Sequence, residues 1–157
     1  MNETIMDMED KRMKIEIENL THFPLPTHRL RKIALDLTHR DIDLIVCDDT
    51  FIKNINLEHR RKTDATDVLS FPIRGIEGDP SHVPLGSIVI SVDKAQAAAK
   101  QYGHTASEEI QLLFIHGLLH LLGYDHARDH GEMREKEEQL ITHYGLPYSL
   151  IVRAEDA

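Results

Sequence analysis

The stretch from residue 116 to residue 126 places three histidines at the end of a long apolar run. His116 and His120 are four residues apart, so on an α-helix they project from the same face, one turn above the other. Gly123 is expected to end this helix, because glycine adopts the left-handed conformation without a side-chain penalty. The turn that it permits can bring His126 back over the same face. Three neutral imidazoles would then converge as zinc ligands and leave a fourth position for water, which is typical of a catalytic zinc site.

The surroundings of the histidine pair favour metal binding over a chance spacing. The chain contains 11 histidines, so some close pairs are expected without any function. This pair, however, lies in the apolar run from Ile110 to Leu122, where an unpartnered imidazole is costly to bury. We therefore predict one zinc ion per chain, with zinc-bound water as a reactive group.

The same spacing is similar to the zinc-protease pattern H-E-x-x-H-x-x-G-x-x-H, with one departure. Gly117 stands at the position where that pattern has its catalytic glutamate. The general base of a metalloprotease is thus absent, which argues against peptide hydrolysis by that mechanism.

Length and charge limit the classes of protein to which the chain can belong. With 157 residues, of which 41% are hydrophobic, one domain with a sizeable core is expected at 13–150, between a loose leader at 1–12 and a frayed tail at 151–157. The net charge of −9 argues against broad electrostatic binding to nucleic acid but is compatible with a local basic groove. The single cysteine and the lack of a secretory or membrane-spanning pattern predict a cytoplasmic protein without membrane contact.

Hydrophobic periodicity, with glycine and proline as breaks, predicts an α+β fold. Four strands are expected at 13–18, 41–47, 66–71 and 85–92. Five helices are expected at 27–39, 48–59, 93–102, 105–122 and 130–143. Their expected N-terminal caps include Thr27, the run Asp48-Asp49-Thr50, Asp93 and a Thr105–Glu108 capping box. The prediction is a mixed sheet of about four strands packed by about five helices, with the histidine-bearing helix buried at the centre.

Two motifs together resemble those of the YbeY family. The first is Thr66-Asp67-Val68-Leu69-Ser70-Phe71-Pro72, and the second is His116-Gly117-Leu118-Leu119-His120-Leu121-Leu122-Gly123-Tyr124-Asp125-His126. The likeness extends from about Met13 to about His143 and so covers most of the chain. Members of this family are bacterial metal-dependent endoribonucleases and ribosomal RNA maturation factors.

The resemblance implies a zinc-dependent endoribonuclease that is specific for single-stranded RNA. It would act at the 3′ end of the small-subunit 16S ribosomal RNA and in ribosome quality control, with a small-subunit ribosomal protein or an assembly GTPase as further partners. By position, His116, His120 and His126 correspond to the family's zinc ligands, and Arg60 corresponds to its basic active-site residue.

The chain departs from the family pattern at three positions near the first motif. Ser87 stands where an aspartate is usual, and Thr63 and Ala65 stand where an aspartate and a proline are usual. These differences concern the local loop shape and leave the histidine motif unchanged.

Several nearby side chains have two interpretations on the sequence alone. Arg60 is either a solvated surface charge or, as the resemblance implies, the group that contacts the phosphate in the transition state. Asp125 either orients an imidazole or caps the turn. Glu109 lies two helical turns before His116, so it either supports the histidines or favours the helix N-terminus.

Other polar residues are expected to be structural. Ser70 and Thr66 are strand hydroxyls that are candidates for the cleft wall, whereas His104, His130 and His143 lie near helix ends and are expected at the surface. No general base is assigned.

Two further hypotheses compete with the endoribonuclease. One is a zinc hydrolase of the metalloprotease type, which Gly117 disfavours. The other is a non-catalytic ribosome-assembly factor with a structural zinc, which the acidic net charge favours if the partner is a basic ribosomal protein.

Overall fold

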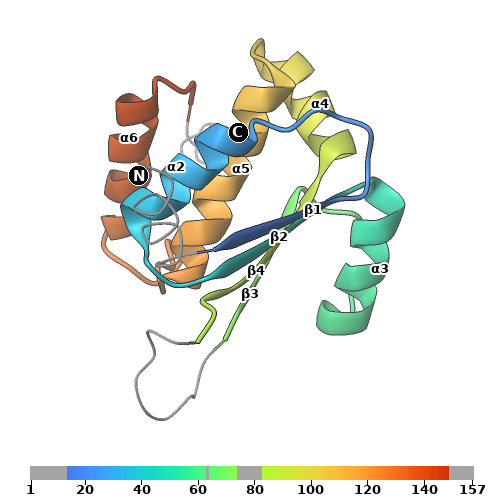
Figure 1. The fold of residues 1–157 in the computed structure, drawn as a ribbon, viewed down its shortest axis with the longest axis horizontal. Helices are drawn as coiled ribbons and strands as arrows, with labels where there is room; N and C mark the ends of the chain where they lie inside the picture. The colour runs from blue at the N-terminus through green and yellow to red at the C-terminus, as the bar shows by residue number, and fades with distance from the viewer. Residues whose placement is uncertain (1–13, 63, 74–82, 149–157) are drawn as a thin grey trace, which may run out of the picture.

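A four-stranded mixed sheet and five helices make up the described part of the computed structural model, residues 14–62, 64–73 and 83–148 (Figure 1). The strands are β1 (Ile15–Asn19), β2 (Ile42–Cys47), β3 (Val68–Pro72) and β4 (Gly86–Ser91). The helices are α2 (Thr27–Leu37), α3 (Asp49–Arg60), α4 (Val92–Tyr102), α5 (Ala106–Leu121) and α6 (Glu132–Tyr144). This arrangement confirms the predicted α+β class and the predicted mixed sheet. The expected leader and tail, and most of the expected loop after Pro72, lie outside the described residues.

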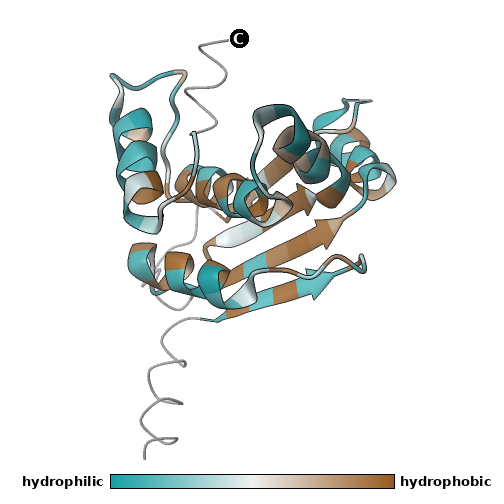
Figure 2. Ribbon diagram, turned by 90° about the horizontal axis from the view of Figure 1, so that it is seen from above, coloured by the Kyte–Doolittle hydropathy of each residue, from teal (hydrophilic) through white to brown (hydrophobic). Residues whose placement is uncertain are grey.

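The order of the strands in the sheet is β1-β2-β4-β3. β1, β2 and β4 run parallel, whereas β3 pairs antiparallel with β4 at one edge. Alternate residues of the central strands, such as Leu44 and Ile88, face the main core under α2, α4, α5 and α6. The opposite face carries a smaller cluster under α3 that includes Cys47 and Ile52. Figure 2 shows hydrophobic residues gathered along the strands and the helix beside them, with hydrophilic outer helix surfaces.

Helix α5 forms the centre of the main core. Its capping box is confirmed: the Thr105 hydroxyl accepts from the Glu108 backbone N–H, and the Glu108 carboxylate accepts from the Thr105 N–H. From residue 109 to residue 121 every position is buried except His116 and His120. The helix therefore directs only these two side chains out of the core. No helix in the described ranges, α5 included, is long and apolar enough to cross a membrane.

Two of the expected helix caps are wrong. Thr27 is the first residue of α2, and the preceding proline supplies no side-chain cap. At α4 the cap is Ser91, whose hydroxyl accepts from the Lys94 N–H at 3.2 Å. Asp93 instead accepts a hydrogen bond from the Asp49 N–H at 2.8 Å, and so joins the starts of α3 and α4. Because α4 begins at Val92, Asp93 lies inside its first turn and not at the N-cap position.

Pro72 is the last residue of β3, although it was expected to stop the strand. Proline is tolerated there because β3 is an edge strand. Its partner in the register is Gly86, with φ of 154°. A Cβ at Gly86 would lie 2.4 Å from the carbonyl oxygen of Phe71 and 2.8 Å from a methyl group of Leu121. Glycine at this position therefore lets β3, β4 and the end of α5 meet directly beneath the histidines.

We expect Gly86→Ala to lower the free energy of unfolding by about 3 kcal/mol, because backbone atoms would have to move to admit the methyl group. The matched control is Gly103→Ala, where φ is 76° and nothing lies within 4 Å of the added carbon. Only backbone strain of about 1 kcal/mol is expected there. Urea unfolding at a fixed zinc concentration measures both values, and equal losses for the two variants would contradict this account.

Candidate metal centre and cleft

The end of α5 brings three imidazole rings together. The Nε2 atoms of His116 and His120 are 3.2 Å apart, and their ring centroids are 4.8 Å apart. Gly123 has φ of 100°, and the turn is closed by a hydrogen bond from the Tyr124 N–H to the Leu119 carbonyl. The chain then returns so that the ring of His126 lies 6.2 and 6.3 Å from the other two centroids. The sequence-based expectation that this turn folds back over the helix face therefore agrees with the geometry.

The hydrogen-bond partners of the two helical histidines fix their tautomers. His116 Nδ1 lies 3.1 Å from a carboxylate oxygen of Glu137, and His120 Nδ1 lies 3.1 Å from the carbonyl oxygen of Tyr124. Both partners accept hydrogen bonds, so each Nδ1 carries the hydrogen and each Nε2 presents a lone pair. Burial, and then the neighbouring His116, lower the pKa of His120, which favours the neutral form of the ring.

Two facing lone pairs fit a cation between them. Nitrogen ligands at about 2.0–2.1 Å from a tetrahedral zinc ion lie about 3.3 Å from each other, close to the 3.2 Å between these Nε2 atoms. The ring centroid of His126 lies 6.2 and 6.3 Å from those of the other two rings, farther than the 4.8 Å between His116 and His120. Within the described residues no three ligand side chains yet enclose one metal position. The residues therefore fit a zinc ion with two fixed ligands and a third on an exposed loop.

Glu137 is the functional residue that the sequence analysis missed. It lies on α6 with 1% of its side chain exposed, and its Oε2 contacts Nδ1 of His116. A carboxylate in this position orients the ring and makes the opposite nitrogen a better ligand. Helical periodicity contained the clue: Glu137 is four residues after Met133 and three before Leu140, so it is a charged residue on the inner, apolar face of its helix.

Glu109 lies in the first turn of α5, in agreement with its interpretation as a carboxylate that favours the helix N-terminus, and it contacts His104. Its carboxylate lies 2.7 Å from His104 Nε2, and the two side chains are 1% and 7% exposed. The prediction that His104 lies at the surface is therefore wrong, because the buried carboxylate draws the ring into the junction of α4 and α5. The carboxylate contact of His116 is made by Glu137 instead. His130 and His143 are exposed, as predicted.

Asp125 caps the turn, which was one of its two interpretations. Its Oδ1 accepts a hydrogen bond from the Ala127 N–H at 3.1 Å, and its Oδ2 lies 3.6 Å from Nε of Arg128. Both contacts lie within the loop between α5 and α6. The side chain therefore shapes the loop that carries His126.

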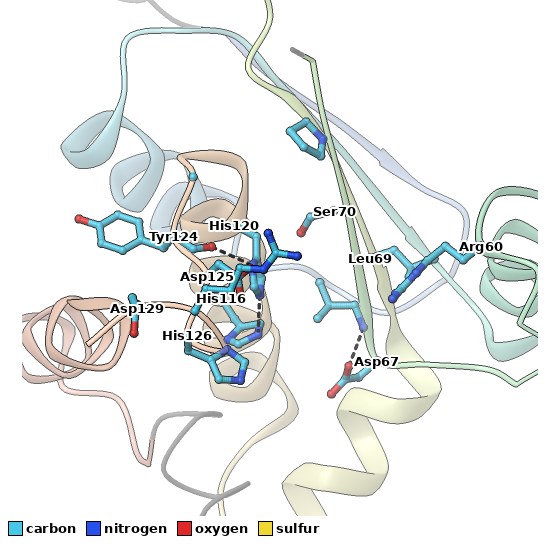
Figure 3. A pocket seen from close by; sticks show the side chains of 14 residues that line it. Arg60, Asp67, Leu69, Ser70, His116, His120, Tyr124, Asp125, His126 and Asp129 are labelled. Carbon is cyan, nitrogen blue, oxygen red and sulfur yellow. Dashed lines mark hydrogen bonds and ion pairs between the residues drawn. The ribbon is translucent and has the colours of Figure 1, made fainter. Parts of the chain in front are cut away.

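A cleft of about 930 Å³ lies between the histidines and the edge strand β3 (Figure 3). Arg60 borders it from the C-terminal end of α3, on the opposite side from the histidines. Ser70 lines the cleft and donates a hydrogen bond to the Gly117 carbonyl at 3.1 Å, whereas Thr66 is not among the lining residues. The structure thus places Arg60 and the three histidines around one cavity, although α3 and α5 are far apart in sequence.

Gly117 packs directly against the sheet. A Cβ there would lie 3.0 Å from Ile88, 3.2 Å from the hydroxyl of Ser70 and 3.3 Å from Val68. These contacts leave no room for a longer side chain unless α5 moves away from β3 and β4. The position that holds the catalytic glutamate of zinc proteases is therefore filled by the packing of helix on sheet.

We expect Glu137→Gln to weaken zinc binding 10- to 100-fold, because the amide removes the negative charge behind His116. Glu138→Gln is the matched control, since Glu138 is exposed and pairs with Arg134 on the outer side of the same helix. Competition with a chromophoric chelator measures both affinities, and circular dichroism checks the fold. Equal zinc affinity in the two variants would exclude a supporting role for Glu137.

Comparison with known proteins supports the family resemblance that the two motifs indicate. The family model described as Endoribonuclease YbeY matches residues 3–145. A protein of Nautilia profundicola named Endoribonuclease YbeY is 52% identical over 142 residues, which cover 90% of this chain and 99% of the relative. One of the same name from Campylobacter jejuni strain RM1221 is 53% identical over 124 residues, or 79% of this chain and 90% of the relative. The solution structure of TM1509 from Thermotoga maritima shares the fold, with a TM-score of 0.55 and 24% identity over 80% of this chain and 85% of that chain. With its matching motifs, fold and sequence, the chain belongs to the YbeY family.

Proposed function

We propose that this protein is a zinc-dependent endoribonuclease that cleaves single-stranded ribosomal RNA in the cytoplasm. The observation that carries the proposal is the pair of facing Nε2 lone pairs on His116 and His120, in the same cleft as the guanidinium of Arg60. The names of the relatives support the reaction class, because they are called endoribonucleases. We further propose that it acts at the 3′ end of the small-subunit ribosomal RNA and in ribosome quality control. This part of the proposal is supported only by the resemblance to the YbeY family.

The chain's own residues would prepare the metal site in three ways. His116, His120 and His126 would hold the ion, and Glu137 and the Tyr124 carbonyl keep two of the rings in the tautomer that a ligand needs. When bound, a zinc ion supplies a Lewis acid and lowers the pKa of a coordinated water to about 7. The open side of the histidine cluster faces the cleft, from which a phosphodiester would approach.

Arg60 is suited to the charge that develops on the phosphate. Its planar guanidinium can donate two hydrogen bonds to phosphate oxygens, and cleavage concentrates negative charge on those oxygens. The side chain is exposed at the last residue of α3 and borders the cleft, so it can reach a phosphate without being desolvated beforehand. It would stabilise the transition state from the side opposite the histidines.

A single strand suits this cleft better than a duplex. His116 and His120 are half-buried at the cleft wall, so the scissile phosphate has to enter the cleft to reach them. A flexible strand can bend one phosphate inward, whereas an A-form duplex presents its backbone on a stiff cylinder. The site therefore favours loops and strand ends of folded RNA.

The metalloprotease alternative has no support in this geometry. A glutamate at Gly117 would have to displace Ile88, Val68 or Ser70, which are packed against the helix. The cleft has three aspartates in its wall, and Asp67, Asp125 and Asp129 each accept at least one backbone hydrogen bond. Among the described residues, no carboxylate stands at the helix position beside the first histidine that the protease mechanism requires.

The proposed function is tested with His120→Ala. We expect the variant to remain folded, to lose stoichiometric zinc and to lose at least 100-fold in the cleavage of a fluorescent single-stranded RNA. Zinc content is measured by atomic emission and folding by circular dichroism. If purified zinc-loaded wild type never cuts RNA, and zinc removal unfolds it, the structural-zinc assembly factor is the better account.

Arg60→Gln separates the phosphate contact from metal binding. We expect kcat/KM to fall roughly 10²- to 10³-fold while zinc content stays at the wild-type level, because one charged donor to the transition state is lost. Arg61→Gln is the matched control, since it is the adjacent arginine and is not among the residues that line the cleft. Wild-type kinetics in the Arg60 variant would remove this residue from the mechanism.

A further inference from the structure

A second arginine lines the cleft on the side of the histidines. Arg128 lies two residues after His126, in the loop between α5 and α6, whereas Arg60 comes from the end of α3. Figure 3 shows Arg60 across the cleft from His126 and from Asp125, the residue with which Arg128 pairs. These are the two cationic side chains among the described residues that line the cleft. The cleft therefore has one arginine on the wall opposite the histidines and a second arginine on the loop that carries His126.

The guanidinium of Arg128 is available for a ligand. Its side chain is 88% exposed, and the contact from its Nε to Asp125 is 3.6 Å long. An exposed ion pair of this length contributes little to stability, so the fold does not require this side chain. Asp125 itself is held by the Ala127 N–H, so the loop keeps its shape without the arginine.

The charge of the cleft gives Arg128 a role in attracting an anion. The charged lining consists of two arginines and the aspartates 67, 125 and 129, which sum to −1 if the histidines are neutral. A divalent cation on the histidines would make the total +1, and without Arg128 it would be 0. A polyanion is therefore attracted more strongly to the loaded cleft when both arginines are present.

We propose that Arg128 binds an RNA phosphate next to the scissile one, on the side of the cleft opposite Arg60, so that the bound strand spans both walls. This proposal rests on the proposed endoribonuclease function and adds a substrate requirement to it. The preferred substrate is a strand with phosphates on both sides of the cleavage position. Arg128 acts in positioning the strand, since it contacts a phosphate that does not react.

The test measures the salt dependence of binding to a strand that cannot be cut. The probe is a fluorescent 2′-O-methyl single strand of about 12 nucleotides, and the protein is the zinc-loaded full chain. Each phosphate contact to a single strand contributes about 0.7 to the slope of log affinity against log salt concentration. We expect Arg128→Gln to lower this slope by about 0.7 and to weaken binding roughly five- to tenfold at low salt.

Two further variants separate a local contact from general charge. Arg134→Gln removes an equal charge from the outer face of α6, where Arg134 pairs with Glu138, and is expected to leave the slope unchanged. Arg128→Lys is expected to restore most of the slope, because the phosphate contact needs the charge. An unchanged slope in Arg128→Gln, or an equal drop in Arg134→Gln, would overturn the proposal.

The failure of this proposal can be told apart from failure of the proposed function. Wild type that cleaves RNA, together with an Arg128→Gln variant of unchanged salt slope, overturns the role of Arg128 alone. Wild type that neither binds nor cleaves single-stranded RNA overturns both.

Discussion

Two imidazole nitrogens that face each other at 3.2 Å are the constraint on which the rest of this site depends. Neutral rings in this geometry bring two lone pairs together, which is unfavourable unless a cation lies between them. The fold maintains this arrangement because Nδ1 of each ring has a hydrogen-bond partner: the buried Glu137 for His116 and the Tyr124 carbonyl for His120. The cost of bringing the two nitrogens together is offset by the burial of the other faces of α5 in the hydrophobic core.

The turn after α5 positions two groups of the site, the ring of His126 and the carbonyl of Tyr124. Gly123, with positive φ, reverses the chain so that His126 approaches the helical pair. The same reversal points the Tyr124 carbonyl at His120, so one glycine supplies both a candidate ligand and the acceptor that orients another. A side chain at Gly123 would meet no neighbour, and the need for glycine is therefore conformational.

The parts of this picture that follow local sequence rules could be predicted. The i, i+4 spacing placed two histidines on one helix face, and the capping box set the start of α5. Contacts between distant segments could not be predicted in this way. Glu137 contacts His116, which lies 21 residues earlier in the sequence. Asp93 accepts a hydrogen bond from the backbone N–H of Asp49, which lies 44 residues earlier. Local pattern does not say which buried carboxylate meets which histidine, and this is why the contact between Glu109 and His104 was not expected.

An acidic protein that acts on RNA needs a positive electrostatic potential at its binding site although its net charge is negative. The net charge is −9, yet screening over about 10 Å makes the cleft the relevant region. There, one oxygen of Asp125 accepts a hydrogen bond from the Ala127 N–H, and hydrogen bonds from the backbone N–H groups of Gly131 and Met133 lower the pKa of Asp129. Both carboxylates shape the loop through these contacts, while the guanidinium groups extend into solvent. The aspartates thus fix the loop that carries His126, and in the proposed mechanism the charge that attracts RNA would come from the arginines and from the ion that the histidines would hold.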